Sequence, residues 1–475
     1  MSTLIVICIS LYLLILISIG LIAHKKRQSN SMKDHYLAGG SLGAFVLLLT
    51  LYATQYSANT LLVTPAEVAD KGLGMILILG YLTFIVISYL TFAPQLFRIS
   101  KKRNFITPGD WFDYRFRLPS LSLIANFVLI IASLNFLLAQ LMAMGHLVNG
   151  ITDGQIPYRA GVIFLALVMI VYETLGGMRA VAWTDVAQGI MLFIGLGGLF
   201  FILLPDLEGL TNISKWLIKN EPQKINLPDP NFQIYWASTV LMIGLGAAVY
   251  PQAIQRIYAA RSLKALKRSM SAMVFMPLFT VLILFLIGIV SIPHFTAIEK
   301  ISHDAVLPYM LEYWGSQSLL GLILTLMVII GLLAAIMSTA DSVLLSLSSI
   351  ISKDILGKTI LKDVSEEQLT KTGKILSWII IWVMVFFALN PKITLFRTIE
   401  LKMQILIQTA PLFLLGVHSK KVTSKGMLIG LSIGFAFAVG TFFLGLKTIA
   451  GIQVGLIAFF LNVLGCYVFS YLFKN

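Results

Sequence analysis

Long apolar runs, separated by short stretches rich in charge, proline and glycine, extend along nearly the whole chain. A hydrocarbon core about 30 Å thick needs about 20 mainly apolar residues per helical crossing, and the runs reach this length. Because they are continuously apolar rather than alternating, they predict helices and not barrel strands. We therefore expect an all-α polytopic membrane protein with about thirteen transmembrane helices, at residues 3–23, 43–67, 72–97, 121–148, 157–176, 179–205, 233–260, 269–293, 317–350, 374–389, 395–417, 426–446 and 449–472.

The composition agrees with lipid as the solvent. Of the 475 residues, 58% are hydrophobic and 12% are charged, which is too few charges to cover a water-soluble protein of this size. The net charge is +14, but the lysines and arginines are scattered through short loops, which excludes a face that binds nucleic acid. The two cysteines fall in separate predicted helices, so we expect neither a disulfide nor a thiolate metal site, and no cofactor.

The positive charges are divided unequally between the two ends of the predicted helices. If the loop after the first helix is cytoplasmic, 24 lysines and arginines lie on that side and 9 on the other. This split predicts a multi-pass protein of the plasma (inner) membrane with its N-terminus outside and its C-terminus in the cytoplasm. The first apolar run is too long for a typical signal peptide, so we expect it to remain as a helix. The outside segments 206–232 and 294–316 should carry short surface helices.

Polar residues interrupt the predicted helix 43–67 near its middle, from Ala53 to Thr60. Irregular backbone at this depth is tolerated where it lines a cavity, and transporters use such breaks to offer carbonyl oxygens to a cation. We therefore predict a discontinuous helix with its break near residues 53–57. The alternative is a continuous helix whose Ser, Thr and Asn side chains bond to neighbouring helices.

A second polar island lies in the predicted helix 317–350. Ala335, Ser338 and Thr339 stand at positions i, i+3 and i+4, so one carbonyl and two hydroxyls share a helix face. Sodium favours such neutral oxygens, and the carbonyls of Ala53 and Tyr56 at the break would complete a cage of five. The alternative is that the small residues of this island only permit close packing of helices.

Two aspartates fall within predicted helices. Asp341 is an intramembrane carboxylate, for which a functional role is the default hypothesis. Asp185 lies only about six residues into its helix, so a role in capping or in contact with water competes with a functional one. Glu173 and Arg179 flank Gly176 and Gly177, and we expect them to form a structural ion pair.

These residues resemble the sodium:solute symporter family, and the similarity covers nearly the whole chain. The resemblance is carried by four motifs that are weak singly but specific in this order: residues 34–40 (DHYLAGG), 176–185 (GGMRAVAWTD), Gln255-Arg256 followed by Ala259-Ala260, and 334–342 (AAIMSTADS). It implies a LeuT-like fold in a single transporter domain, 1–475. Two inverted repeats of five helices, at 43–205 and 233–417, would follow one helix and precede two.

The resemblance also implies roles for single residues. The family's sodium site falls on the five residues of the cage already described, with Asp185 as a nearby carboxylate that aids coupling. Substrate would lie beside the break and the facing helix 233–260, in contact with Gln55, Ser57, Asn59, Thr60, Gly246 and Tyr250. Proline carriers have an aspartate where this chain has Gln55, and aromatic residues in the stretch 243–251, so the pattern favours pantothenate or another organic acid.

The expected function is sodium-driven symport of a small organic solute, an organic acid, a vitamin such as pantothenate or an amino acid, by alternating access. Membrane lipid and the sodium ion would be its other partners, and no obligate protein partner is expected. Proton coupling through Asp185 or Asp341 is one alternative. A membrane sensor is another, but such sensors carry a soluble signalling module and we expect none after residue 472. No histidine pairs with an obvious nucleophile, so we do not expect an enzyme.

Overall fold

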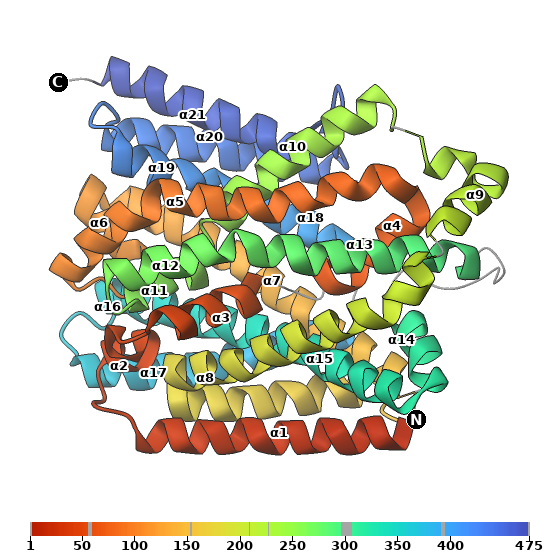
Figure 1. Ribbon diagram of the computed structural model, residues 1–475. Coiled ribbons are helices and arrows are strands. Elements are labelled where there is room, and N and C mark those ends of the chain that lie inside the picture. Colours follow the sequence, from red (N-terminus) through yellow and green to blue (C-terminus); the bar gives the residue numbers. More distant parts are fainter. Residues whose placement is uncertain are drawn as a thin grey trace.

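The computed structural model is a bundle of helices that run side by side along a common axis (Figure 1). It describes residues 2–55, 59–152, 154–208, 210–226, 228–295, 306–390 and 395–473. Within these ranges the only strands form a short antiparallel hairpin that pairs Thr448 with Gln453. The all-α membrane fold predicted from the apolar runs is therefore confirmed.

The elements follow one another along the chain with few long connections. The first half contains α1 (Ser2–Lys25), α2 (Met32–Leu37), η1 (Ala38–Gly40), α3 (Ala44–Gln55), η2 (Asn59–Val63), α4 (Thr64–Lys71), η3 (Gly72–Leu77), α5 (Ile78–Arg103), α6 (Pro108–Phe116), α7 (Pro119–Ile151), α8 (Tyr158–Glu208), α9 (Leu210–Asn220) and η4 (Pro222–Lys224). The second half contains α10 (Pro230–Ala247), α11 (Pro251–Ala259), α12 (Leu263–Met273), α13 (Phe275–Phe295), α14 (Val306–Gln317), α15 (Leu319–Ser349), η6 (Ile350–Leu356), α16 (Gly357–Thr359), α17 (Glu366–Leu389), α18 (Leu395–Leu406), η7 (Ile407–Thr409), α19 (Ala410–His418), α20 (Ser424–Phe443), β1 (Thr448–Ile449), β2 (Ile452–Gln453) and α21 (Val454–Leu472).

Ten described helices are long and apolar enough to cross a membrane, or eleven if a bent pair counts as one crossing. The shorter apolar helix α3 is not among them. The long element α8 is broken at Gly177, whose φ of +56° is left-handed, and its two halves are separate rods in Figure 1. A side chain at Gly177 would meet the backbone of His35, so glycine is required there. The count of thirteen crossings stays a prediction.

The break predicted near residues 53–57 falls largely on residues that the structure does not describe. Ala53, Thr54 and Gln55 are helical in α3, and residues 56–58, which include Tyr56 and Ser57, lie outside the described residues. The described chain resumes as the π-helical segment η2 and as α4, and the predicted break stays a prediction.

A break between α10 and α11 was not predicted. The sequence-based expectation of one continuous helix over residues 233–260 is wrong, because α10 and α11 meet at an angle of 50°. Pro251 begins α11, and it follows Tyr250, whose ψ of 133° is not helical. A proline lacks the N–H of a helical hydrogen bond and disfavours helical backbone in the residue before it.

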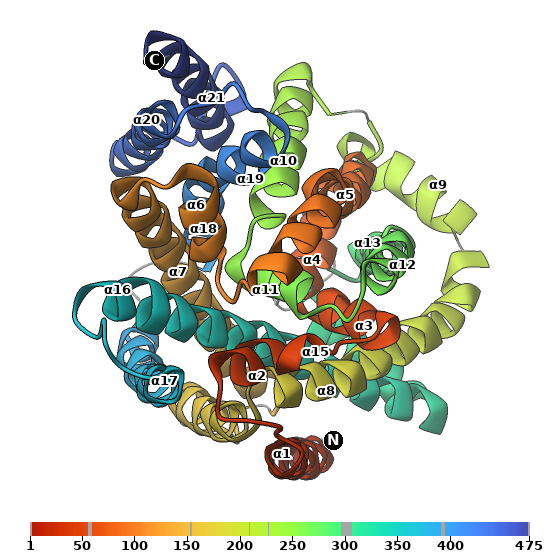
Figure 2. The same ribbon diagram turned by 90° about the vertical axis from the view of Figure 1, so that its left-hand side faces the viewer.

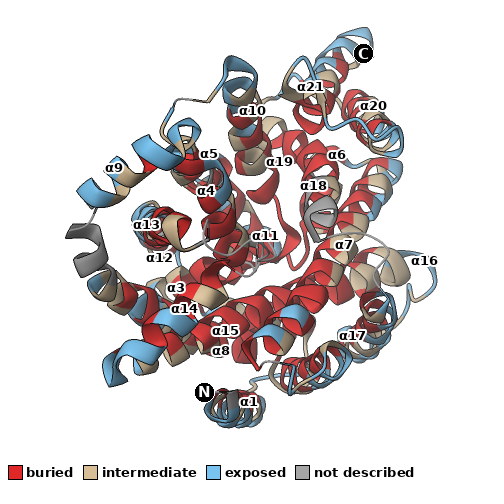
Figure 3. Cartoon of the chain, turned by 90° about the vertical axis from the view of Figure 1, so that its right-hand side faces the viewer, coloured by how far each residue is buried: buried red, intermediate tan, exposed pale blue. Residues whose placement is uncertain are grey.

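Buried residues fill the centre of the bundle and exposed residues cover its periphery (Figure 3). The helix α15 is central, and its segment 331–349 is buried throughout. Large apolar side chains are exposed on outer helices, for example Leu14 on α1 and Phe386 on α17, as expected where lipid is the solvent. Viewed along the bundle, α1 and α21 lie at the periphery and α3, α4, α11 and α15 lie inside it (Figure 2).

Different short helices lie at the two ends of the bundle. The described N-terminal end lies at one end with α9 and α14, whereas the C-terminus lies at the other with α2, α6 and α16 (Figure 1). The elements α9 and η4, and α14, are the short helices expected in segments 206–232 and 294–316.

Candidate functional site

The end of α3 contacts the hydroxyl face of α15 at the centre of the bundle. Thr339 donates its hydroxyl to the carbonyl of Ala335 at 3.0 Å, and its oxygen lies 3.5 Å from the carbonyl oxygen of Thr54. Ala53 is buried beside Thr54. Four of the five predicted cage residues therefore lie on two touching segments, and the fifth, Tyr56, lies outside the described residues.

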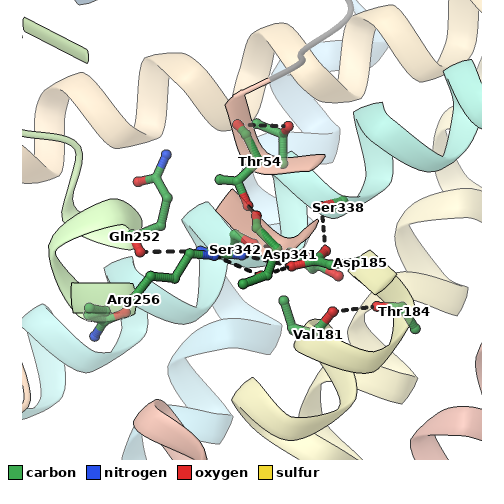
Figure 4. Close-up of polar contacts among 12 residues, drawn as sticks. Thr54, Val181, Thr184, Asp185, Gln252, Arg256, Ser338, Asp341 and Ser342 are labelled. Atoms are coloured by element: carbon green, nitrogen blue, oxygen red, sulfur yellow. Dashed lines mark hydrogen bonds and ion pairs between the residues drawn. The ribbon is translucent and has the colours of Figure 1, made fainter. Parts of the chain in front are cut away.

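Asp185 lies beside this junction rather than at a water-exposed helix end. Its Oδ1 accepts a hydrogen bond of 2.5 Å from Ser338, and its Oδ2 accepts one from Thr50 of α3. The side chain is fully buried. One carboxylate of α8 thus joins α3 to the predicted hydroxyl face of α15 (Figure 4).

The guanidinium of Arg256 pairs with Asp185 across 2.9 Å, and both side chains have no exposed surface. It also donates to the hydroxyls of Thr50 at 2.8 Å and Ser342 at 2.7 Å, and to the carbonyl of Gln252 at 3.2 Å (Figure 4). The positive charge is therefore held in one orientation by an anion and three neutral oxygens. A buried charge needs this compensation, since removing it from water is costly.

Sequence reasoning did not assign this role to Arg256. The residue was recognised within a predicted helix and in the Gln255-Arg256 motif, but its partner was not identified. An arginine within a helix at membrane depth needs an anion, and Asp185 and Asp341 were the buried candidates. The need for an anionic partner could be inferred from the sequence, whereas the choice between the two aspartates could not.

Asp341 accepts a hydrogen bond of 2.6 Å from the hydroxyl of Tyr172 and one of 3.3 Å from Ser342. Because Ser342 also accepts from Arg256, it connects the two buried aspartates through one hydroxyl. Among the described residues no cation forms an ion pair with Asp341.

A cavity of about 190 Å³ lies next to the junction, between α3, α4, α5, α7, α10 and α18. Its lining includes three of the predicted substrate-binding residues, Gln55, Thr60 and Tyr250. Gly246 precedes the lining residue Ala247 and lies close to η7. Of the remaining predicted residues, Ser57 lies outside the described residues and so does the side chain of Asn59.

The helix α3 and the bent pair of α10 and α11 are linked beside this cavity. Gln55, at the end of α3, donates a hydrogen bond of 2.7 Å to the hydroxyl of Tyr89. That hydroxyl donates in turn to the carbonyl of Ala247 at 3.4 Å, at the end of α10. Tyr89 was not predicted to take part, because an apolar helix gives no signal of where a single hydroxyl will point.

One wall of the cavity consists of a lysine and two stacked rings. Phe136 and Tyr250 stack with centroids 5.1 Å apart and planes 17° from parallel. The ammonium of Lys402 lies 3.5 Å from the centroid of Phe136 and 5.3 Å from that of Tyr250. Lys402 is 2% exposed and was assigned no role by the sequence analysis.

An ion pair joins α8 to α2 near the end of the bundle that carries α2 and α6. The guanidinium of Arg179 pairs with the carboxylate of Asp34 at 2.8 Å. The prediction of an ion pair between Arg179 and Glu173 is therefore wrong. Glu173 instead accepts from Ser377 at 3.4 Å. The sharp turn at Gly177 directs Arg179 toward α2, which sequence proximity to Glu173 did not anticipate.

Known transporters resemble this chain over nearly its whole length. The sequence profile of the sodium:solute symporter family matches residues 35–434. The chain is 26% identical to the sodium/pantothenate symporter of Haemophilus influenzae, over 96% of this chain and 95% of that protein. It is 25% identical to the osmoregulated proline transporter OpuE of Bacillus subtilis, over 100% of this chain and 96% of that protein.

The fold is also that of a solved transporter. A Na⁺-coupled sialic acid symporter in a substrate-bound outward-open state superposes with a TM-score of 0.80 at 18% identity, covering 99% of this chain and 97% of that one. This likeness shows the LeuT-like fold. The match of the family profile to most of the chain decides the membership: the protein belongs to the sodium:solute symporter family of membrane transporters.

Proposed function

We propose that this protein imports a small organic solute by alternating access and holds its coupling ion between α3 and α15. Symport driven by sodium follows from membership of the family. The solute class, the residues of the sodium site and the direction of transport are our proposal. The observation that carries it is the contact of the α3 end with the hydroxyl face of α15.

The hydrogen bonds at this junction support a role for its oxygens in holding a cation. The hydroxyl of Ser338 donates a hydrogen bond to Asp185, and that of Thr339 donates one to the carbonyl of Ala335. Each hydroxyl oxygen therefore keeps lone pairs for a cation. In this proposal Ala53, Tyr56, Ala335, Ser338 and Thr339 contribute the five oxygens.

Asp185 acts in this proposal as a positioning residue. Arg256 already balances its charge, so the carboxylate orients the hydroxyl of Ser338. Sodium bound here would hold α3 against α15 and so favour one arrangement of the bundle. Asp341 is connected to the same network through the hydroxyl of Ser342, so a change in the arrangement of the bundle would alter its hydrogen bonds.

The solute would occupy the cavity beside the junction, where Gln55, Thr60 and Tyr250 lie. Ser57, Asn59 and Gly246 stay proposed contacts. The link from Gln55 through Tyr89 to Ala247 joins the end of α3 to the bent pair of α10 and α11, so a solute in the cavity can affect both. The excess of positive charge at the end with α2 and α6 supports a cytoplasmic location of that end, in the plasma (inner) membrane.

The test is uptake into proteoliposomes at fixed pH over a range of sodium concentrations. Replacing Ser338 or Thr339 by Ala should raise the sodium concentration for half-maximal uptake by about tenfold, because each removes one oxygen ligand. Ser291→Ala is the matched control, since this buried hydroxyl of α13 donates to the carbonyl of Gly288 in its own helix. Unchanged sodium dependence in both variants would refute the proposed cage.

The same preparation separates the alternatives. A proton-coupled carrier would take up solute without sodium and respond to a pH gradient instead. A membrane sensor would bind solute but would not exchange labelled for unlabelled solute across the vesicle membrane.

A further inference from the structure

The cavity carries an unbalanced positive charge. The charged residues of its lining are Glu67, Lys71 and Lys402. Glu67 and Lys71 are on the same helix four residues apart and form an ion pair with each other. Lys402 comes from α18 on another side of the cavity and, among the described residues, it has neither an ion pair nor a hydrogen bond. The excess charge of the cavity therefore belongs to Lys402.

Burial makes this lysine unusual. At 2% exposure its ammonium is removed from water, and the two aromatic faces of Phe136 and Tyr250 compensate it only in part. Other buried cations of the bundle have acidic partners, as Arg256 has Asp185. A buried ammonium without an anion is a costly feature that a bound anion would relieve.

A second donor in the same cavity also has no acceptor. The indole N–H of Trp236 is buried without a hydrogen-bond partner in the described part of the chain, and Trp236 lines the cavity with Lys402. An indole nitrogen and an ammonium can only donate. Two donor-only groups without acceptors favour a ligand group that has several acceptor atoms and carries no proton, such as a carboxylate.

We propose that the transported solute is a carboxylate anion, held through its carboxylate by Lys402 with Trp236 as a further donor. The inference rests on the proposed function, because it specifies which solute occupies that cavity. The stacked rings of Phe136 and Tyr250, with Ile243 and Met403, provide an apolar surface for the rest of the solute. Lys402 contributes more than charge, since its contact with Phe136 fixes the ammonium at one wall.

The experiment compares carboxylates with uncharged counterparts of nearly the same shape. Purified protein would be screened by thermal shift in sodium chloride and in potassium chloride with pantothenate and pantothenol, benzoate and benzamide, nicotinate and nicotinamide, and propanoate and propanamide. Any hit would then be followed by uptake into proteoliposomes. The variants are Lys402→Gln, Lys402→Arg and, as the control, Lys371→Gln, which removes an exposed lysine of α17 that pairs with Glu367 and lies outside the cavity lining.

We expect at least one carboxylate to stabilise the wild type in a sodium-dependent way, with its uncharged counterpart at least about tenfold weaker. Lys402→Gln should weaken that carboxylate by about tenfold or more and leave stabilisation by sodium alone unchanged. Lys402→Arg should keep part of the affinity, and the exposed control Lys371→Gln should stay within about twofold of wild type.

Three results would overturn the inference: a response to none of the carboxylates, equal binding of the charged and uncharged members, or full carboxylate affinity in Lys402→Gln. If that variant fails to fold, the comparison of paired solutes on the wild type decides the matter. Failure of the proposed function is a different result, because it would appear as a wild type that is neither stabilised nor driven by sodium.

Discussion

Arg256 and Lys402 are two cations buried in the same bundle, and their surroundings are opposite. Arg256 faces Asp185 and three neutral oxygens, so its charge and its donors are satisfied within the protein. Lys402 faces two aromatic rings, and among the described residues no anion pairs with it. A charge compensated by the chain stabilises a fixed arrangement, whereas a charge left without an anion is suited to a ligand that comes and goes.

The contrast also separates the two tasks of a coupled carrier. The network of Arg256 touches α3, α8, α11 and α15, and so connects the elements that would hold the coupling ion. Lys402 belongs to a cavity between α3, α4, α5, α7, α10 and α18. Gln55 is at their border, because it ends α3 and lines the cavity.

The most severe test of the comparison removes each cation in turn. Arg256→Met leaves Asp185 buried without its partner and should cost about 3–5 kcal/mol of folded stability. Lys402→Met leaves no described anion unpaired and should leave stability equal or higher. Thermal unfolding of the purified variants measures both, and Asp185→Asn combined with Arg256→Met should recover much of the loss. Equal losses for the two single variants would contradict the distinction between them.

A smaller effect is expected from the hydroxyl that joins the ion pair to α3. Thr50→Val removes the hydroxyl that donates a hydrogen bond to Asp185 and accepts one from Arg256. The loss should lower the free energy of unfolding by about 1–3 kcal/mol. Thr184→Val is the matched control, because its hydroxyl bonds only to carbonyls of its own helix. The melting temperatures of the two variants should differ clearly, and similar values would show that Thr50 is not part of a tight network.

The link across the cavity should matter less for stability and more for binding. Tyr89→Phe removes the hydroxyl between Gln55 and Ala247, which should weaken solute binding by about fivefold, equivalent to about 1 kcal/mol. Tyr52→Phe also removes a buried tyrosine hydroxyl, one that contacts Thr280 away from the cavity, and should leave affinity unchanged. Competition against any solute found in the screen measures both, and equal affinities would remove Tyr89 from the site.

The smallest effect is expected at the pair of Lys353 and Asp110, which is partly exposed, with 22% and 16% of the two side chains accessible. Burial acts to raise the pKa of Asp110, but the ammonium of Lys353 and the backbone N–H groups of Ile106 and Thr107 together lower it below its ordinary value. A lowered pKa means that the pair stabilises the fold above about pH 4 and loses this contribution as the pH falls further. Lys353→Met should cost about 1 kcal/mol or less at pH 7, and less still at pH 3. A loss that does not shrink in acid would contradict this assignment.

Much of the candidate site could be predicted because its chemistry is local. The i, i+3, i+4 spacing that puts Ala335, Ser338 and Thr339 on one face is a property of any helix, and the structure keeps it. The polar residues near Gln55 were visible as an interruption of an apolar run, and the break that they predict stays a prediction. The observed break before Pro251 was missed because apolar residues surround it and hydrophobicity alone does not report backbone angles.

The apolar runs by themselves determined that this chain is an α-helical membrane protein, because lipid leaves every backbone polar group to be satisfied within its own segment. They also located the polar island of α15. Only the tertiary structure decided that Arg256 forms an ion pair with Asp185. It also decided that Lys402 lies over the ring of Phe136 and forms no ion pair with a described anion. These pairings join segments from distant parts of the chain, and the direction of a side chain across a bundle depends on how helices are rotated and bent.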